Sequence, residues 1–187
     1  MDDKPIMTPD LQLITSRLTL RLIHADEAKQ LSTMIRRSPS LYPWLDWCHQ
    51  DFTTSEADDF LLHTRLNWVK NMAYGFGVFT RNTNELIGMA ALTDRAFSFN
   101  MGTIGYWIQD SHQHRGYAQE ATQAVIQFCF HDLKLTRIEF ICDPGNLASH
   151  QVALACGATN EGLARNRYIF NSQPKDGLVF SVIPSNG

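Results

Sequence analysis

The sequence lacks the features that mark membrane, secreted and metal-bound proteins. Its 187 residues include only four cysteines and no Cys-x-x-Cys pair, so we expect reduced thiols rather than disulfides or a zinc site. No apolar run approaches the roughly 18 residues that span a bilayer. The start, Met1 to Pro5, lacks the basic and apolar regions of a secretory leader. We therefore expect a cytoplasmic protein that does not enter a membrane.

An excess of basic residues is also missing. Lysine and arginine number 16 against 19 aspartate and glutamate, which gives a formal net charge of −3. Direct nucleic-acid binding is therefore not expected, and a basic or amine-bearing partner fits better. A hydrophobic share of 44% with 19% charged residues excludes a disordered chain. The length predicts a single domain over residues 1–187, with enough chain to bury a core.

The periodicity of apolar residues predicts the order of the elements. Alternation with a period of two predicts strands at 17–22, 74–80, 85–92, 101–108, 137–142, 159–168 and 178–183. Spacing of three and four predicts helices at 26–37, 53–71, 118–129 and 147–156. The strand–helix–strand unit over 101–142 implies a parallel crossover. The fold class is therefore α/β, with α+β character: a mixed, mostly antiparallel sheet of six to seven strands flanked by four helices.

The loop between the strand at 101–108 and the next helix has the composition of an anion-binding turn. It contains the run Gln113, His114, Arg115, Gly116, Tyr117 and Ala118. The small residues let the backbone approach a ligand, and the first N–H groups of a helix have no internal acceptor. Arg115 and His114 can add charge-assisted bonds to phosphate. The alternative is that Gly116 is a plain turn residue.

Three motifs in order resemble the Gcn5-related N-acetyltransferase superfamily. They are Ile104-Gly105-Tyr106-Trp107-Ile108, then Gln113-x-x-Gly116-x-Ala118, then Asn146-x-x-Ser149 after the following strand. The resemblance extends from Arg17 to Ile183. The Leu45-Asp46-Trp47 loop and the Ile-Gly-Tyr-Trp strand look like the RimJ/RimL-like branch, which acetylates N-terminal serine or alanine of ribosomal proteins. The resemblance implies acetyl-CoA as co-substrate and no metal.

It also implies where acetyl-CoA would bind. The strand at 101–108, fourth in order, would bulge and splay from the fifth strand at 137–142. Unpaired backbone groups of Trp107, Ile108 and Gln109 would then pair with the pantetheine arm, as an added strand pairs with a sheet edge. The pyrophosphate would lie on residues 113–118, and the resemblance adds Asn146 to the cofactor-binding residues. Gly105 is either a bulge, a close-approach site or a packing glycine.

The resemblance assigns the proton donor for the departing thiolate to Ser149. Many superfamily members use a tyrosine one turn later, but that position is Ala153 here. The alternative for Ser149 is an ordinary helix-start serine that bonds a backbone group. Cys142 could in principle form an acyl-enzyme, but it lies inside a predicted strand with no adjacent base.

The general base is missing from both expected positions. The glutamates of the superfamily align with Thr103 and Tyr168. Glu161 is the nearby carboxylate, either a base or a solvated strand residue, and we expect water-relayed proton loss through Asp46, Glu161 or Tyr168. An α-amine with a pKa near 8 is roughly 10–20% neutral at cytosolic pH, whereas lysine is below about 0.1% neutral. A site without a strong base therefore favours α-amines.

The aromatic loop before the second helix is the expected acceptor side. Trp44 and Trp47, with Tyr42 and Phe52, could wall the acceptor groove or belong to the core. Asp46 among them would attract an α-ammonium group. His112, His114 and His131 are expected to be polar loop groups rather than metal ligands.

The sequence thus predicts an acetyl-CoA-dependent N-acetyltransferase that acts on the N-terminal α-amine of a protein or peptide by direct attack in a ternary complex. Ribosomal proteins with N-terminal serine or alanine are the implied acceptors. Two alternatives stay open. One is a small-amine acetyltransferase for polyamines, amino acids or aminoglycosides, and the other is a non-catalytic module that senses acetyl-CoA. A monomer and a homodimer are equally compatible with the sequence.

Overall fold

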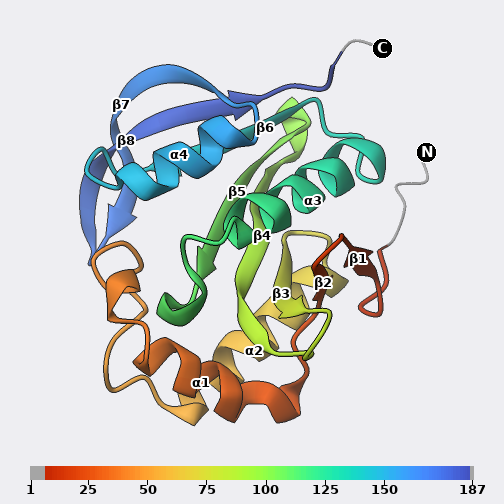
Figure 1. Ribbon diagram of the computed structural model, residues 1–187. Coiled ribbons are helices and arrows are strands. Elements are labelled where there is room, and N and C mark those ends of the chain that lie inside the picture. Colours follow the sequence, from red (N-terminus) through yellow and green to blue (C-terminus); the bar gives the residue numbers. More distant parts are fainter. Residues whose placement is uncertain (1–6, 186–187) are drawn as a thin grey trace.

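The computed structural model describes residues 7–185, which form one eight-stranded sheet and four α-helices (Figure 1). The strands are β1 (Gln12–Ile14), β2 (Leu18–Arg21), β3 (Tyr74–Thr80), β4 (Leu86–Ala96), β5 (Met101–Ile108), β6 (Arg137–Cys142), β7 (Thr159–Phe170) and β8 (Gln173–Val182). The helices are α1 (Ala28–Arg36), α2 (Thr54–Val69), α3 (Tyr117–His131) and α4 (Leu147–Ala155). The expectation drawn from Met1 to Pro5 lies outside the described residues.

The sheet is mixed, as the sequence predicts. Its strand order is β1-β2-β3-β4-β5-β6-β8-β7, and the described strands pair antiparallel except for β5 and β6, which are parallel. The strand count of six to seven is too low, because β1 was not predicted. With three residues, β1 is too short to show a period of two, and it forms by pairing Leu13 with Leu20 at the sheet edge.

The last hairpin is longer than predicted. Asn171 and Ser172 both have positive φ values, of 48° and 60°, which is the backbone of a primed two-residue turn. The strand therefore resumes at Gln173 and does not wait until Leu178. Pro174 is tolerated because β6 pairs with β8 only from Leu178 onward, so Pro174 needs no bond on that side.

Two hydrophobic cores hold the helices on the sheet. The larger core joins the sheet to α3 and α4 through side chains such as Val125, Phe128 and Ala153. The smaller core lies under α1 and α2, and it contains Leu31 and Trp107. β5 contributes Ile104 to the larger core and Trp107 to the smaller one, so it is packed on both faces of the sheet. Within residues 7–185, none of the helices combines the length and the hydropathy that a membrane span requires.

Candidate active site

The parallel pair β5–β6 separates after three residues. Met101, Gly102 and Thr103 pair with Arg137, Ile138 and Glu139, and the recorded pairing then stops. β5 continues to Ile108 and β6 to Cys142 without facing each other in a ladder. We call this diverging pair of edges the splay. The expected separation of the fourth and fifth predicted strands is thus confirmed.

Only part of the predicted backbone edge faces the splay. The N–H of Gln109 donates to the carbonyl of Ile87 at 2.8 Å. The backbone N–H and C=O groups of successive residues point to alternate sides of an antiparallel strand. Those of Trp107 therefore also pair with β4, whereas those of Tyr106 and Ile108 point toward the splay. The prediction that Trp107 and Gln109 offer unpaired backbone groups is therefore wrong. Of the three predicted residues, only Ile108 points its backbone groups toward the splay. Its carbonyl already accepts a bond from Gln113 Nε2 at 2.9 Å.

The bulge lies on β4 and not on β5. Leu92 pairs with Ile104, and Asp94 pairs with Thr103, so Thr93 is the extra residue. A Cβ atom at Gly105 would lie 3.1 Å from Thr93 Cγ2, tighter than an ordinary contact. Gly105 is therefore a close-approach position opposite the bulge. The sequence could not distinguish these options, because the extra residue belongs to the neighbouring strand.

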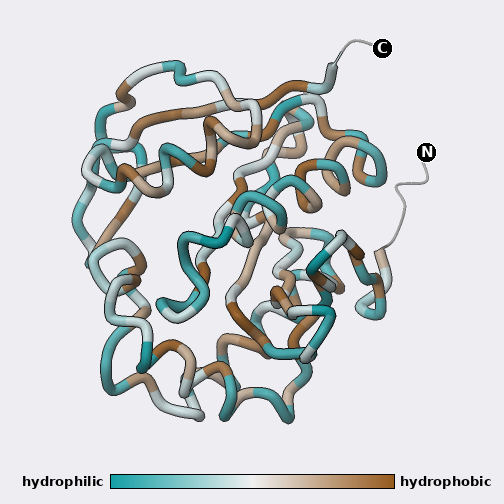
Figure 2. Tube along the Cα trace, in the orientation of Figure 1, coloured by the Kyte–Doolittle hydropathy of each residue, from teal (hydrophilic) through white to brown (hydrophobic). Residues whose placement is uncertain are grey.

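The predicted anion-binding turn opens α3 beside the end of β5. Gly116 is the N-cap residue with φ of +77°, and its carbonyl accepts the first helical bond, from Glu120 N–H at 3.0 Å. The N–H groups of Tyr117, Ala118 and Gln119 consequently have no acceptor inside the helix. The turn is drawn as a hydrophilic segment in Figure 2. Its geometry fits a phosphate group.

The other residues of this turn have different surroundings. His114 and Arg115 are exposed, and His114 has φ of +59°. The Gln113 amide bonds the Ser40 hydroxyl at 2.9 Å as well as Ile108, so it braces the turn against the α1–α2 loop. His112 lies beside Gln109, with its Nδ1 2.9 Å from the amide nitrogen.

Arg17 contacts this turn, although sequence analysis did not identify it as a site residue. Its Nη1 donates to the Arg115 carbonyl at 2.9 Å, and its Nε bonds Glu120 at 2.6 Å. The guanidinium carbon lies 4.5 Å from the centre of the Tyr117 ring. Arg17 therefore holds the first turn of α3, where its charge is paired with that of Glu120. In the sequence it is only a polar residue at a strand start.

Ser149 lies at the other side of the splay, in a cluster of neutral hydrogen donors. Its Oγ is 3.0 Å from the Tyr106 hydroxyl and 3.2 Å from Cys142 Sγ. Tyr106 also donates to the Ser149 carbonyl at 2.8 Å. Asn146 caps α4 by accepting from the Ser149 N–H at 3.2 Å. The cap uses the side-chain oxygen of Asn146 and the backbone N–H of Ser149, so the Ser149 hydroxyl is left for other partners.

Burial keeps this cluster protonated. It raises the pKa of the Tyr106 hydroxyl, and neighbouring Cys142 raises it further. Burial also raises the pKa of the Cys142 thiol, against the opposing effect of its bond to Ser149. A neutral, buried thiol is a poor nucleophile, so the geometry disfavours an acyl-enzyme on Cys142. Tyr106 belongs to the Ile-Gly-Tyr-Trp motif of β5, but its side chain was not predicted to belong to the site.

Glu161 is not brought to this cluster. Its carboxylate bonds Arg137 Nη1 at 3.0 Å and the Ser181 hydroxyl at 2.6 Å. These bonds lower the pKa of Glu161 to about 2, Arg137 having the larger effect. Arg137 begins β6, whereas Ser149 contacts Cys142 at the end of that strand. Of the two expectations for Glu161, the solvated strand residue fits the structure, and a catalytic base does not.

Tyr168 lies nearer to Ser149 than Glu161 does. Its hydroxyl donates to Asp143 Oδ2 at 2.7 Å, and Asp143 directly follows Cys142. Burial and then the Asp143 carboxylate raise the pKa of Tyr168. Burial alone would raise the pKa of Asp143, but bonds from the Gly145 N–H and Tyr168 keep it below its usual value. The ionised group beside the cluster is therefore Asp143, which the sequence did not nominate.

The α1–α2 loop reaches two other loops near the splay. Asp46 Oδ2 accepts from the Asn171 N–H at 3.1 Å, which joins this loop to the β7–β8 turn (Figure 1). Trp44 is 38% exposed, and its Cη2 lies 3.8 Å from the position of a Cβ at Gly145. These contacts place Trp44 against the β6–α4 connection and Asp46 against the β7–β8 turn.

The remaining aromatic residues of this loop are packed inward. Trp47 stacks on Phe60 with ring centroids 4.8 Å apart and meets Trp107 edge-on at 6.0 Å. Phe52 is buried, and Tyr42 donates to the Arg36 carbonyl at 2.9 Å. Phe52 therefore belongs to the smaller core, and the half-buried Trp47 packs against that core. Within residues 7–185, no group of three or more histidine, cysteine or acidic side chains is arranged to hold a metal ion.

The splay has a helix N-terminus on one side and neutral hydrogen donors on the other, which matches the N-acetyltransferase class that the motifs imply. Residues 17–159 match the family model of the acetyltransferase (GNAT) domain, and the chain belongs to this family. The resemblance stated from the sequence is thereby confirmed.

Relatives and solved structures agree with this family. A solved structure from Vibrio cholerae, described as a candidate ribosomal-protein-serine acetyltransferase, is 53% identical, with a TM-score of 0.88 over 95% of this chain and 100% of that one. The ribosomal-protein-serine acetyltransferase of Escherichia coli is 28% identical over 91% of this chain and 94% of its own. The probable N-acetyltransferase YjcK of Bacillus subtilis is 34% identical over 61% of this chain. The match covers 64% of that relative's length.

Proposed function

We propose that this chain transfers the acetyl group of acetyl-CoA to the N-terminal α-amine of a protein or peptide, with ribosomal proteins that start with serine or alanine as the acceptor class. The observation that carries the proposal is the splay of β5 from β6, with the amides of α3 on one side and the Ser149 cluster on the other. Family membership and the names of the relatives support the same reaction.

The residues present fit acetyl-CoA. The Tyr117, Ala118 and Gln119 N–H groups are available to an anion, and the positive φ of Gly116 favours a residue without a side chain. Arg115 adds an exposed positive charge on the same turn, and Arg17 braces the turn through the Arg115 carbonyl. The backbone groups of Tyr106 and the N–H of Ile108 are directed at the splay, where they can bond an extended amide-bearing arm. When bound, acetyl-CoA supplies the activated thioester.

The Ser149 cluster supports proton delivery to the leaving group. In the transfer, the amine nitrogen bonds the carbonyl carbon, the carbon–sulfur bond breaks, and the thiolate takes a proton. Ser149 gives that proton from its hydroxyl and takes in its place, through water, the proton that the attacking amine releases, so that no serine alkoxide is left. Tyr106 orients Ser149 through the carbonyl of the same residue, and its raised pKa keeps it neutral. Because the Ser149 hydroxyl is already held in place, no water molecule has to be ordered to deliver the proton at that step.

The acceptor side favours an α-amine. Within residues 7–185, no carboxylate contacts Ser149, and Asp143 is already bonded by Tyr168 and Gly145. An amine that is partly neutral near pH 7 needs no strong base, and an α-amine meets this condition far better than a lysine side chain. The proton leaves through water. Asp46 attracts the incoming ammonium group, and Trp44 forms one wall beside it.

The test is free-thiol release from acetyl-CoA in the presence of defined acceptors. We expect turnover with peptides that start with serine or alanine. The matched control is the same peptide with its α-amine blocked and an internal lysine retained, and this control should stay at background. Mass spectrometry would locate the acetyl group on the first residue.

The other arms of the assay contain polyamines, amino acids and aminoglycosides. Turnover confined to these small amines would replace the peptide acceptor with a small-molecule acceptor. Tight binding of acetyl-CoA without turnover in any arm would make the chain a sensor. Either result would overturn the proposal.

A further inference from the structure

Helix α2 carries a second apolar stripe on its outer side. Leu62 is 55% exposed, Leu66 is 42% exposed and Val69 is 65% exposed. Their spacing of four and three places them on one face of the helix, apart from the face that buries Leu61 and Trp68. A helix with one packed face needs only one apolar stripe, so this second stripe has no role in the fold of a single chain.

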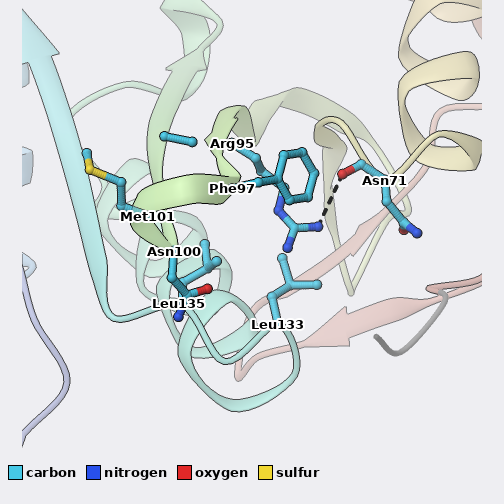
Figure 3. A pocket seen from close by; sticks show the side chains of 8 residues that line it. Asn71, Arg95, Phe97, Asn100, Met101, Leu133 and Leu135 are labelled. Atoms are coloured by element: carbon cyan, nitrogen blue, oxygen red, sulfur yellow. Dashed lines mark hydrogen bonds between the residues drawn. The ribbon is translucent and has the colours of Figure 1, made fainter. Parts of the chain in front are cut away.

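The stripe continues beyond the end of α2. Met72 follows the helix and is 49% exposed. Arg95 Nη1 donates to the Asn71 carbonyl at 3.1 Å, and the Arg95 guanidinium lies 4.6 Å from the centre of the Phe97 ring (Figure 3). Phe97, 44% exposed, is thus held beside the same end of α2. Exposed apolar side chains gathered on one helix face and beside its end mark an interaction site. We call Leu62, Leu66, Val69, Met72 and Phe97 the α2 face.

The charges along α2 are arranged for a second copy of the same helix. Asp58 and Asp59 lie at its N-terminal end, and Arg65 and Lys70 lie toward its C-terminal end. All four residues are exposed, and none forms an ion pair within residues 7–185. The midpoint between Leu62 and Leu66 is also the midpoint between Asp58 and Lys70. A two-fold axis at that point sets Leu62 against Leu66 of the second copy and Asp58 against its Lys70.

We propose that the α2 face is the interface of a homodimer, in which two α2 helices pack antiparallel about a two-fold axis. Such an interface is self-complementary, as two-fold symmetry requires. A parallel arrangement would set Asp58 against Asp58 and Lys70 against Lys70. A membrane surface fits poorly, because helices that lie on bilayers flank their apolar face with an excess of lysine and arginine, whereas this face is flanked by two aspartates and two basic residues.

The test is the molar mass of the full chain in solution across a concentration series, by light scattering after size exclusion and by sedimentation equilibrium. We expect twice the chain mass of 21.3 kDa. Leu66→Glu sets a carboxylate against Leu62 in both halves of the interface, so the dissociation constant should rise at least about 100-fold. The matched control is Leu154→Glu on α4, where a leucine of similar exposure, 46%, is replaced and the dimer should persist.

Charge variants test the antiparallel geometry without touching the apolar residues. Asp58→Lys should weaken the dimer several-fold, and Asp58→Lys combined with Lys70→Asp should restore it, because the pairs are then exchanged. A parallel interface would show neither effect. The proposal is overturned by a wild-type chain that stays monomeric, by a dimer that Leu66→Glu leaves intact, or by equal loss in the Leu154→Glu control. Circular dichroism on each variant checks that it folds.

Discussion

At the scale of single residues, Ser149 and Tyr106 share one set of hydrogen bonds but have separable roles. The Ser149 hydroxyl contacts both Tyr106 and Cys142, whereas Tyr106 holds α4 through the Ser149 carbonyl. Ser149→Ala removes the hydroxyl and leaves that carbonyl bond in place. We therefore expect kcat to fall ten-fold or more, with acetyl-CoA affinity nearly unchanged, as measured by thiol release and calorimetry.

Tyr106→Phe is the paired comparison. It keeps the aromatic ring, which packs edge-on with Phe140 at 6.1 Å, and it removes only the orienting hydroxyl. The loss of kcat should be smaller than in Ser149→Ala. If Tyr106→Phe alone disabled the enzyme, the tyrosine would be the proton donor and the assignment to Ser149 would be wrong.

Glu161 makes a pH-dependent contribution to stability and none to turnover. Its pKa in the folded chain is about 2, below the ordinary value of 4.5, because Arg137 and Ser181 bond the ionised form. The stabilisation is therefore complete above pH 4.5 and is lost as the pH falls toward 2. Glu161→Gln should lower the melting temperature at pH 7 and flatten its fall between pH 4.5 and 2.

Thermal unfolding at several pH values measures this effect, and the thiol assay measures turnover of the same variant. Parallel melting curves for wild type and variant would contradict the linkage. A ten-fold loss of turnover would return Glu161 to the role of base.

Sequence reasoning found the residues whose signal is local and missed those that act at a distance. Gly116 opens a helix, which composition predicts, and Ser149 lies three residues after Asn146 in a motif that the family resemblance identifies. Tyr106 meets Ser149 across 43 positions, and Arg17 reaches Arg115 across 98. No periodicity encodes such contacts, because they depend on how the strands and helices pack.

At the scale of elements, the strands that flank the site were predicted as accurately as β3, whose bounds of Tyr74–Thr80 also match the prediction. β5 and β6 have the predicted bounds, because alternation is clear and polar turns limit both runs. The bulge was assigned to the wrong strand, since register shifts depend on the partner as well as on the strand itself. Pairing also decides the direction of backbone groups, which is why Trp107 and Gln109 could not be excluded from the sequence.

The first turn of α3 gives a prediction with an internal control. Gly116 and Gly162 both have positive φ, of +77° and +108°, so alanine at either position costs roughly 1 kcal/mol of folding stability. A Cβ at Gly116 would also lie 3.3 Å from Arg17 Nη2, whereas no atom lies within 4 Å at Gly162. Gly116→Ala should therefore abolish most of the melting-temperature rise caused by acetyl-CoA, and Gly162→Ala should keep it.

Equal ligand stabilisation in the two variants would show that the phosphate groups bind away from this turn. Equal loss in both would point to general destabilisation. Differential scanning fluorimetry with and without acetyl-CoA is sufficient to separate these outcomes.

At the scale of the whole molecule, the acceptor side is assembled from three loops that are distant in the sequence. The α1–α2 loop contacts the β6–α4 connection through Trp44 and the β7–β8 turn through Asp46. The sequence predicted that the aromatic loop faces the acceptor, but it could not show that only Trp44 is exposed while Trp47 is packed against the second core. That division depends on the packing of α2, which places Phe60 against Trp47.

Asp46 has one observed contact and one proposed function in this assembly, and two substitutions separate them. Its carboxylate holds the Asn171 N–H, and its charge attracts an ammonium group. Asp46→Asn keeps an oxygen acceptor for Asn171 but removes the charge, so the KM for a serine-starting peptide should rise about three- to ten-fold, with kcat little changed. Asp46→Ala removes both functions and should raise KM further, because the β7–β8 turn is no longer tied to the loop. Initial-rate kinetics over a range of peptide concentrations measure both effects. A KM for Asp46→Asn equal to that of the wild type would leave Asp46 with the structural role alone.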